Sequence, residues 1–81
     1  MSENEQQFIK SEIVAQLKGK VKPKQVVLAY PMFKIEMEKE INASTNTWLF
    51  SYDTSLITAD EMLHLMKNSQ FVSTAEFRKK I

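Results

Sequence analysis

The sequence contains no cysteine, one glycine and two prolines among its 81 residues. The absence of cysteine excludes disulfide bonds, thiolate zinc sites and cysteine nucleophiles. The single glycine, Gly19, leaves no glycine-rich loop that could hold a phosphate group. No apolar run approaches the ~20 residues that a helix needs to cross a bilayer. The polar N-terminal residues also lack the basic and apolar regions of a signal peptide, so we expect a cytoplasmic protein with no membrane partner.

What the chain does contain is a composition close to that of folded domains, with 43% hydrophobic and 26% charged residues. Such a chain has enough apolar surface to fold. We expect residues 1–81 to form a single domain with a thin core, because a chain of this length buries only about two thirds of its surface on folding.

The charges are segregated along the chain although the net charge is only +1. Residues 13–35 carry five lysines and no acidic residue, whereas residues 36–76 are predominantly acidic. A net charge near zero argues against a protein whose whole surface binds the phosphates of nucleic acid. The segregation nevertheless leaves local basic patches that can contact an anion.

The first half of the chain predicts a helix followed by a short strand. A capping box at Ser2–Glu5 precedes apolar residues at helical spacing, and Gly19 ends the pattern. β-branched and aromatic residues predict a short strand over 25–30, and Pro31 closes it. Residues 25–41 also fit a helical period, so strand and helix both stay open there, although Pro31 favours the strand.

The middle of the chain predicts an antiparallel β-hairpin, with strands at about 33–41 and 46–53. Apolar and charged residues alternate in the first strand, and the aromatic residues alternate in the second. The register places Met37 opposite Phe50 and Lys39 opposite Trp48, which gives one apolar face. The other face carries Glu36, Glu38 and Glu40.

Two short helices are predicted at the C-terminal end. Thr58–Glu61 is a capping box for a helix that runs to about Lys67, and Ser73–Glu76 repeats the signal for a helix over 73–81. Two short helices joined by a tight turn resemble a helix-turn-helix, whose second helix enters the major groove of DNA. The whole pattern is an α+β fold: N-terminal helix, short strand, hairpin and two C-terminal helices.

Catalytic signals are absent from the sequence. His64 is the only histidine, and Asp60 precedes it by one helical turn, but neither a nucleophile motif nor a second metal-ligating histidine accompanies them. We therefore predict no enzymatic activity, no metal, no cofactor and no small-molecule substrate.

The sequence supports two binding hypotheses. In the first, a small regulatory or accessory protein binds nucleic acid through a lysine-rich loop and a basic C-terminal helix, using Lys20, Lys22, Lys24, Arg78 and Lys79. In the alternative, the chain is an adaptor or inhibitor that binds protein or forms a homodimer through its hairpin, using Phe33, Glu36, Glu38, Trp48 and Phe50. The sequence does not name the partner.

Overall fold

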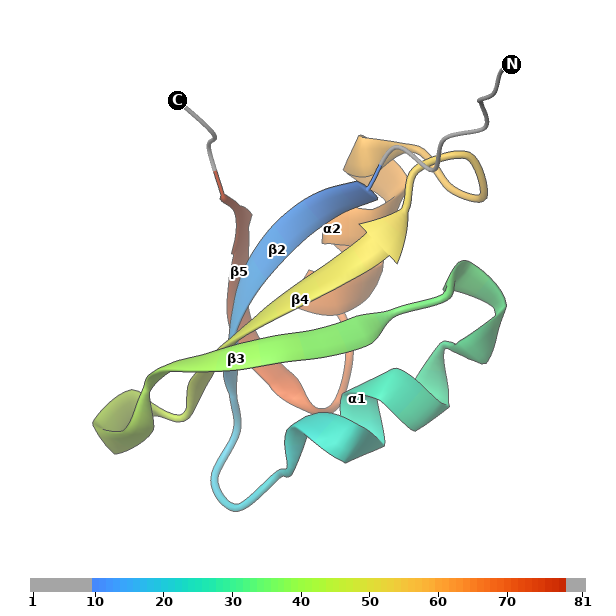
Figure 1. Cartoon of the computed structure of the whole chain (residues 1–81). Coiled ribbons are helices and arrows are strands. Elements are labelled where there is room, and N and C mark those ends of the chain that lie inside the picture. The colour runs from blue at the N-terminus through green and yellow to red at the C-terminus, as the bar shows by residue number, and fades with distance from the viewer. Residues whose placement is uncertain (1–9, 79–81) are drawn as a thin grey trace.

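A computed structural model describes residues 10–78 of the chain (Figure 1). Its centre is a four-stranded antiparallel sheet made of β2 (Lys10–Leu17), β3 (Glu36–Asn42), β4 (Thr47–Asp53) and β5 (Val72–Phe77). Two α-helices, α1 (Pro23–Ala29) and α2 (Ala59–Lys67), and two 3-10 helices, η1 (Pro31–Phe33) and η2 (Ala43–Thr45), connect the strands.

The strand order is β3-β4-β2-β5. Each α-helix joins two parallel strands that have one antiparallel strand between them: α1 joins β2 to β3 across β4, and α2 joins β4 to β5 across β2. This is the connectivity of the ferredoxin-like, or split β-α-β, arrangement.

Both helices pack on one side of the sheet. Val26 from α1 and Met62 and Met66 from α2 belong to the same buried cluster as Ile13 and Phe50 from the central strands. In Figure 1, α2 lies behind β2 and β4, and α1 runs beneath β3. The core therefore lies between the sheet and a layer of two helices.

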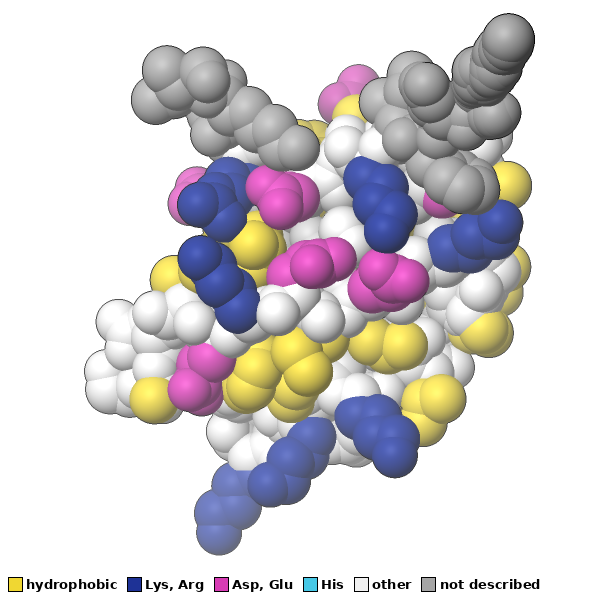
Figure 2. Space-filling view, in the orientation of Figure 1, with side chains coloured by type: hydrophobic (Ala, Val, Ile, Leu, Met, Phe, Trp, Pro, Cys, Tyr) yellow, Lys and Arg dark blue, Asp and Glu magenta, His cyan; other side chains and the backbone are white. Residues whose placement is uncertain are grey.

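The opposite side of the sheet, which we call the open face, carries no helix among the described residues. Its side chains alternate in β2 and β4 with those of the core, and they include several carboxylates. Ser51 Oγ donates to Glu38 Oε2 at 2.6 Å, and Lys10 Nζ lies 3.1 Å from Glu36 Oε1. In Figure 2, acidic and basic side chains lie together over the strands, above a band of hydrophobic ones.

The hairpin of β3 and β4 has the predicted partners only in part. Met37 lies opposite Phe50 as expected, but Glu40 rather than Lys39 lies opposite Trp48. The register shifts between Met37 and Lys39 and again between Glu40 and Asn42, so β3 contains two bulges. Glu40 therefore leaves the row of carboxylates that the strict alternation had predicted.

The predicted layout of elements is wrong at three places. The N-terminal helix is replaced by β2 from Lys10 onward, while the capping box at 2–5 lies outside the described residues. The strand predicted over 25–30 is α1, because Pro23 occupies the first helical turn, where its missing N–H costs nothing.

The third error concerns the C-terminal helix over 73–81: residues 73–77 belong to the strand β5 (Val72–Phe77), and residues 79–81 lie outside the described part of the chain. Ala75 of β5 lies opposite Ala15 of β2 and is buried against the core. A strand in this position removes the second helix of the expected helix-turn-helix, so that resemblance is wrong as well.

Candidate functional site

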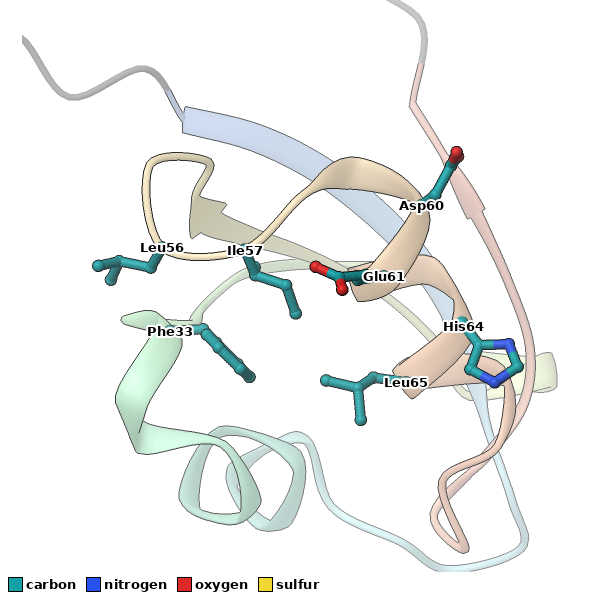
Figure 3. Close-up of a pocket in the computed structure, with 7 residues that line it drawn as sticks. All are labelled: Phe33, Leu56, Ile57, Asp60, Glu61, His64 and Leu65. Atoms are coloured by element: carbon teal, nitrogen blue, oxygen red, sulfur yellow. The ribbon is translucent and has the colours of Figure 1, made fainter.

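An apolar groove of about 650 Å³ lies on the helix side of the sheet, between η1, the loop after β4 and α2 (Figure 3). Its lining residues are Phe33, Leu56, Ile57, Asp60, Glu61, His64 and Leu65. The side chains of Phe33, Ile57 and Leu65 point toward a shared space, so three separate elements supply a hydrocarbon floor. We call this surface the groove.

Two local structures position residues that line the groove. The first is η1, which ends at Phe33 and is followed by Lys34 in the left-handed conformation, with φ of 56°, where the chain turns toward β3. The second is the turn after β4, in which the backbone N–H and the hydroxyl of Ser55 both donate to Asp53 Oδ1, at 2.9 and 2.7 Å. This turn presents Leu56 and Ile57.

The charged residues at the groove are mainly acidic. Thr58 Oγ1 caps α2 by accepting the backbone N–H of Glu61 at 3.2 Å, and it donates to Glu61 Oε1 at 3.0 Å. The Glu61 side chain consequently lies over the groove, whereas Asp60 points outward at its margin (Figure 3). Among residues 10–78, no lysine or arginine lines the groove.

Exposed hydrophobic side chains belong to the groove lining, to η1 and to α1. Leu56, 45% exposed, belongs to that lining, and Met32, 59% exposed, adjoins Phe33 in η1. Leu28, 66% exposed, lies on α1, one helical turn after the exposed Lys24. We call Lys24, Leu28 and Met32 the ridge.

A second cleft, of about 510 Å³, lies at the far end of β2 from Lys10. The loop 19–23 and the hairpin end near Trp48 line it, with Lys20, Lys22 and Glu40 as the charged residues. Asn46 Oδ1 accepts the indole N–H of Trp48 at 2.8 Å. We call this surface the lysine cleft.

The structure does not bring the predicted nucleic-acid residues together. Lys20, Lys22 and Lys24 are exposed on the loop after β2 and at the start of α1. The backbone N–H of Arg78, in contrast, donates to the Glu12 carbonyl at the start of β2. The two groups are separated by the length of that strand, roughly 20 Å, and Lys79 lies outside the described residues.

The residues predicted as a protein interface lie on different surfaces. Phe50 is 1% exposed and Trp48 is half-buried, and both pack in or against the core. Glu36 and Glu38 lie on the open face. Phe33 alone lines the groove, because the hairpin's aromatic side faces the helices.

Leu56, Ile57 and Leu65 were not predicted from the sequence as site residues. One signal for the groove was present: α2 carries four large apolar residues, Met62, Leu63, Leu65 and Met66, which is more than one helix face needs for a core. Met62 and Met66 fill the core, and Leu65 is left to line the groove.

The described residues contain no group of three side chains suited to hold a metal ion. His64 is exposed, and its Nε2 lies 3.3 Å from Asn68 Nδ2. Asp60, its predicted partner, points in a different direction (Figure 3). The two clear pKa shifts fall outside the groove: burial raises the pKa of the Tyr52 hydroxyl, and hydrogen bonds from Ser55 lower the pKa of the Asp53 carboxyl.

Within residues 10–78, none of the helices has the length and apolar character required to cross a membrane. Comparison of the chain with protein-family models, with curated proteins and with solved structures finds no match. Functional inference therefore rests on the surfaces described above.

Proposed function

We propose that this chain is a non-catalytic interaction module whose groove binds a protein segment that carries apolar side chains and one cationic side chain. The observation that carries this proposal is the groove itself, with its floor of Phe33, Ile57 and Leu65. An apolar concavity with few polar groups is the usual form of a binding site. The exposed hydrophobic residues around it are typical of a protein interface rather than of free surface.

The acidic residues define the charge of the partner. Asp60 and Glu61 lie at the groove without a lysine or arginine among its lining residues. A lysine or arginine of the partner would therefore meet a complementary charge, which favours the correct orientation and speeds association. Each leucine-sized side chain that enters the groove contributes about 1.5 to 3 kcal/mol if it is fully buried.

Selection from a phage-displayed peptide library tests this proposal directly. We expect the chain to select peptides that combine two or three apolar residues with a lysine or arginine. Amide chemical-shift changes on addition of a selected peptide should centre on Ile57, Glu61 and Leu65. Selected peptides that shift only residues of the open face would refute the proposal, as would a failure to select any sequence.

Matched variants test whether the selected peptides bind at the groove. Leu56→Ser alters an exposed residue of the groove, and Ile41→Ser alters an equally exposed hydrophobic residue on β3. We expect the first variant to weaken peptide binding at least tenfold, because it removes apolar contact area, about 1.4 kcal/mol in free energy. The second should bind as the unaltered chain does.

The lysine cleft supports a second candidate function, the binding of single-stranded nucleic acid. Lys20 and Lys22 are exposed beside the half-buried ring of Trp48, and a strand can place its phosphates on the lysines and a base against the indole. Glu40 in the lining of the cleft opposes this mode. The cleft is therefore the weaker basis for a function.

Salt dependence tests this second candidate. We expect binding to a labelled oligonucleotide to weaken roughly tenfold or more between ~50 and ~200 mM salt if two or three phosphates are neutralised. Changing Lys20 and Lys22 together to alanine should abolish it, whereas Lys67→Ala, an exposed lysine on α2, should leave it intact. The absence of binding at the lower salt concentration would eliminate this candidate.

A further inference from the structure

The ridge carries the groups that we propose the groove binds, a cationic side chain and large apolar side chains. Lys24 and Leu28 stand one helical turn apart on α1, and Met32 follows in η1. All three are exposed, and they comprise one cationic and two large apolar side chains. A partner of the groove needs this combination of groups.

The ridge and the groove are adjacent on the same molecule. Met32 of the ridge and Phe33 of the groove are consecutive residues of η1. A twofold axis that sets the ridge of each copy in the groove of the other would form both contacts at once. In such an isologous arrangement both grooves are filled, so assembly ends at the dimer.

We infer that the occupant of the groove is the ridge of a second copy of this chain, with Lys24 of one copy against Glu61 of the other. This inference rests on the proposed function, because both use the same groove. Leu28, Met32 and Leu56, three of the five large hydrophobic residues that are exposed within residues 10–78, are covered in this dimer.

The size of the chain is compatible with such a contact. The total accessible surface is 5308 Å², and a standard interface takes about 800 Å² from each partner. A dimer of this kind would thus cover roughly a seventh of each copy. The alternative self-association, pairing of sheet edges, is opposed at β3 by its two bulges and its glutamates.

Sedimentation equilibrium between ~1 µM and ~1 mM protein tests the inference. We expect a reversible monomer–dimer equilibrium in the unaltered chain. Changing Leu28 and Met32 together to serine should weaken dimerisation at least 100-fold. The matched control changes Met37 and Ile41, two exposed large hydrophobic residues of β3, to serine and should leave the equilibrium unchanged. Thermal unfolding followed by circular dichroism verifies that each variant is folded.

A charge exchange identifies the contact itself. Lys24→Glu and Glu61→Lys should each weaken dimerisation about tenfold, because each opposes two like charges at both copies of the contact. The two changes in one chain should restore most of the lost affinity. Dimerisation that survives the ridge variant, or a double variant no better than the singles, overturns the inference.

The outcomes separate the inference from the proposed function. A chain that stays monomeric up to ~1 mM but selects peptides at the groove refutes the dimer and retains the interaction module. A chain that neither dimerises nor selects peptides refutes both. A dimer that selected peptides dissociate, with shifts at Ile57 and Leu65, supports both.

Discussion

The side-chain amide of Asn46 donates a hydrogen bond to the carbonyl oxygen of Val21 at 3.0 Å and so joins two loops that are 25 residues apart in sequence. The same amide donates to the Gly19 carbonyl at 3.3 Å, and its oxygen accepts the indole N–H of Trp48. Asn46 itself has a left-handed backbone, with φ of 54°. One residue therefore closes the hairpin, orients Trp48 and fixes the loop that carries Lys20.

Asn46→Ala is expected to destabilise the chain by about 2 to 4 kcal/mol. It removes up to three hydrogen bonds worth about 1 kcal/mol each, and alanine lacks the short polar side chain that lets asparagine occupy the left-handed conformation, which adds about 1 kcal/mol. Asn46→Gly removes the same hydrogen bonds without the backbone strain, so it should be about 1 kcal/mol milder. Urea unfolding monitored by Trp48 fluorescence measures both, and equal effects would show that the backbone conformation contributes nothing.

Tyr52→Phe is expected to leave stability unchanged or to raise it by up to about 1 kcal/mol. Tyr52 is 1% exposed, and its hydroxyl has no hydrogen-bond partner within bonding geometry in residues 10–78. Removing a buried hydroxyl without a partner relieves a desolvation penalty while the ring keeps its packing. A fall in melting temperature of several degrees would contradict this view and indicate a partner such as the Ser11 hydroxyl, which lies across the strand pair.

The pKa of the Asp53 carboxyl predicts an acid-sensitive contribution to stability. The Ser55 hydroxyl and backbone N–H lower that pKa below its ordinary value of 3.8. The unfolded chain therefore takes up the proton first as the pH falls, so the contribution is complete above pH 3.8 and is lost as the pH falls through the folded-state pKa.

Ser55→Ala tests that sign. It should destabilise the chain at pH 6, where the carboxylate accepts both hydrogen bonds in the unaltered chain, and the difference should narrow toward pH 2. Chemical denaturation across this range gives the comparison. A difference that is constant with pH would show that Ser55 acts without favouring the ionised form of Asp53.

Thr58→Ala is expected to lower both the stability of the chain and the affinity of the groove for peptides. Loss of the cap is expected to cost about 0.5 to 2 kcal/mol, and the first turn of α2, which carries Glu61, should fray. Peptide affinity at the groove should fall along with stability. If hydrogen exchange of the first turn of α2 is unchanged in the variant, the Thr58 hydroxyl does not hold that turn.

The elements that the sequence predicted well depend on local signals. Thr58 caps α2 as expected by accepting the backbone N–H of Glu61, its hydroxyl donates to the Glu61 carboxylate, and α2 runs to Lys67 as expected. The hairpin occurs as well, with strands at Glu36–Asn42 and Thr47–Asp53. In both cases the determining residues lie within a few positions of one another.

The elements that were predicted wrongly depend on distant partners. Ile13 and Leu17 fit a helical spacing, but with Ala15 between them they also fit a strand, and pairing with both β4 and β5 selects the strand. The signal at Ser73–Glu76 is equally local, yet β2 supplies the pairing that overrides it. A pattern cannot show a sheet partner that lies 60 residues away.

The groove could not be predicted from the sequence for the same reason. Phe33, Ile57 and Leu65 meet only because η1, the loop after β4 and α2 converge on one side of the sheet. The lysine loop was visible in the sequence, but Arg78 is held at the other end of β2. Charge patterning identified exposed residues, and it carried no information about which of them share a surface.

The strand order β3-β4-β2-β5 also determines when the sheet can be completed during synthesis. β2 lies between β4 and β5, so one edge of β2 stays unpaired in a nascent chain that contains β4 but not yet Val72–Phe77. Pairing across so many residues is slow to form, and an unpaired strand flank invites aggregation. The chain should therefore reach its stable state only after β5 has left the ribosome, and a version that ends after α2 should remain dependent on chaperones.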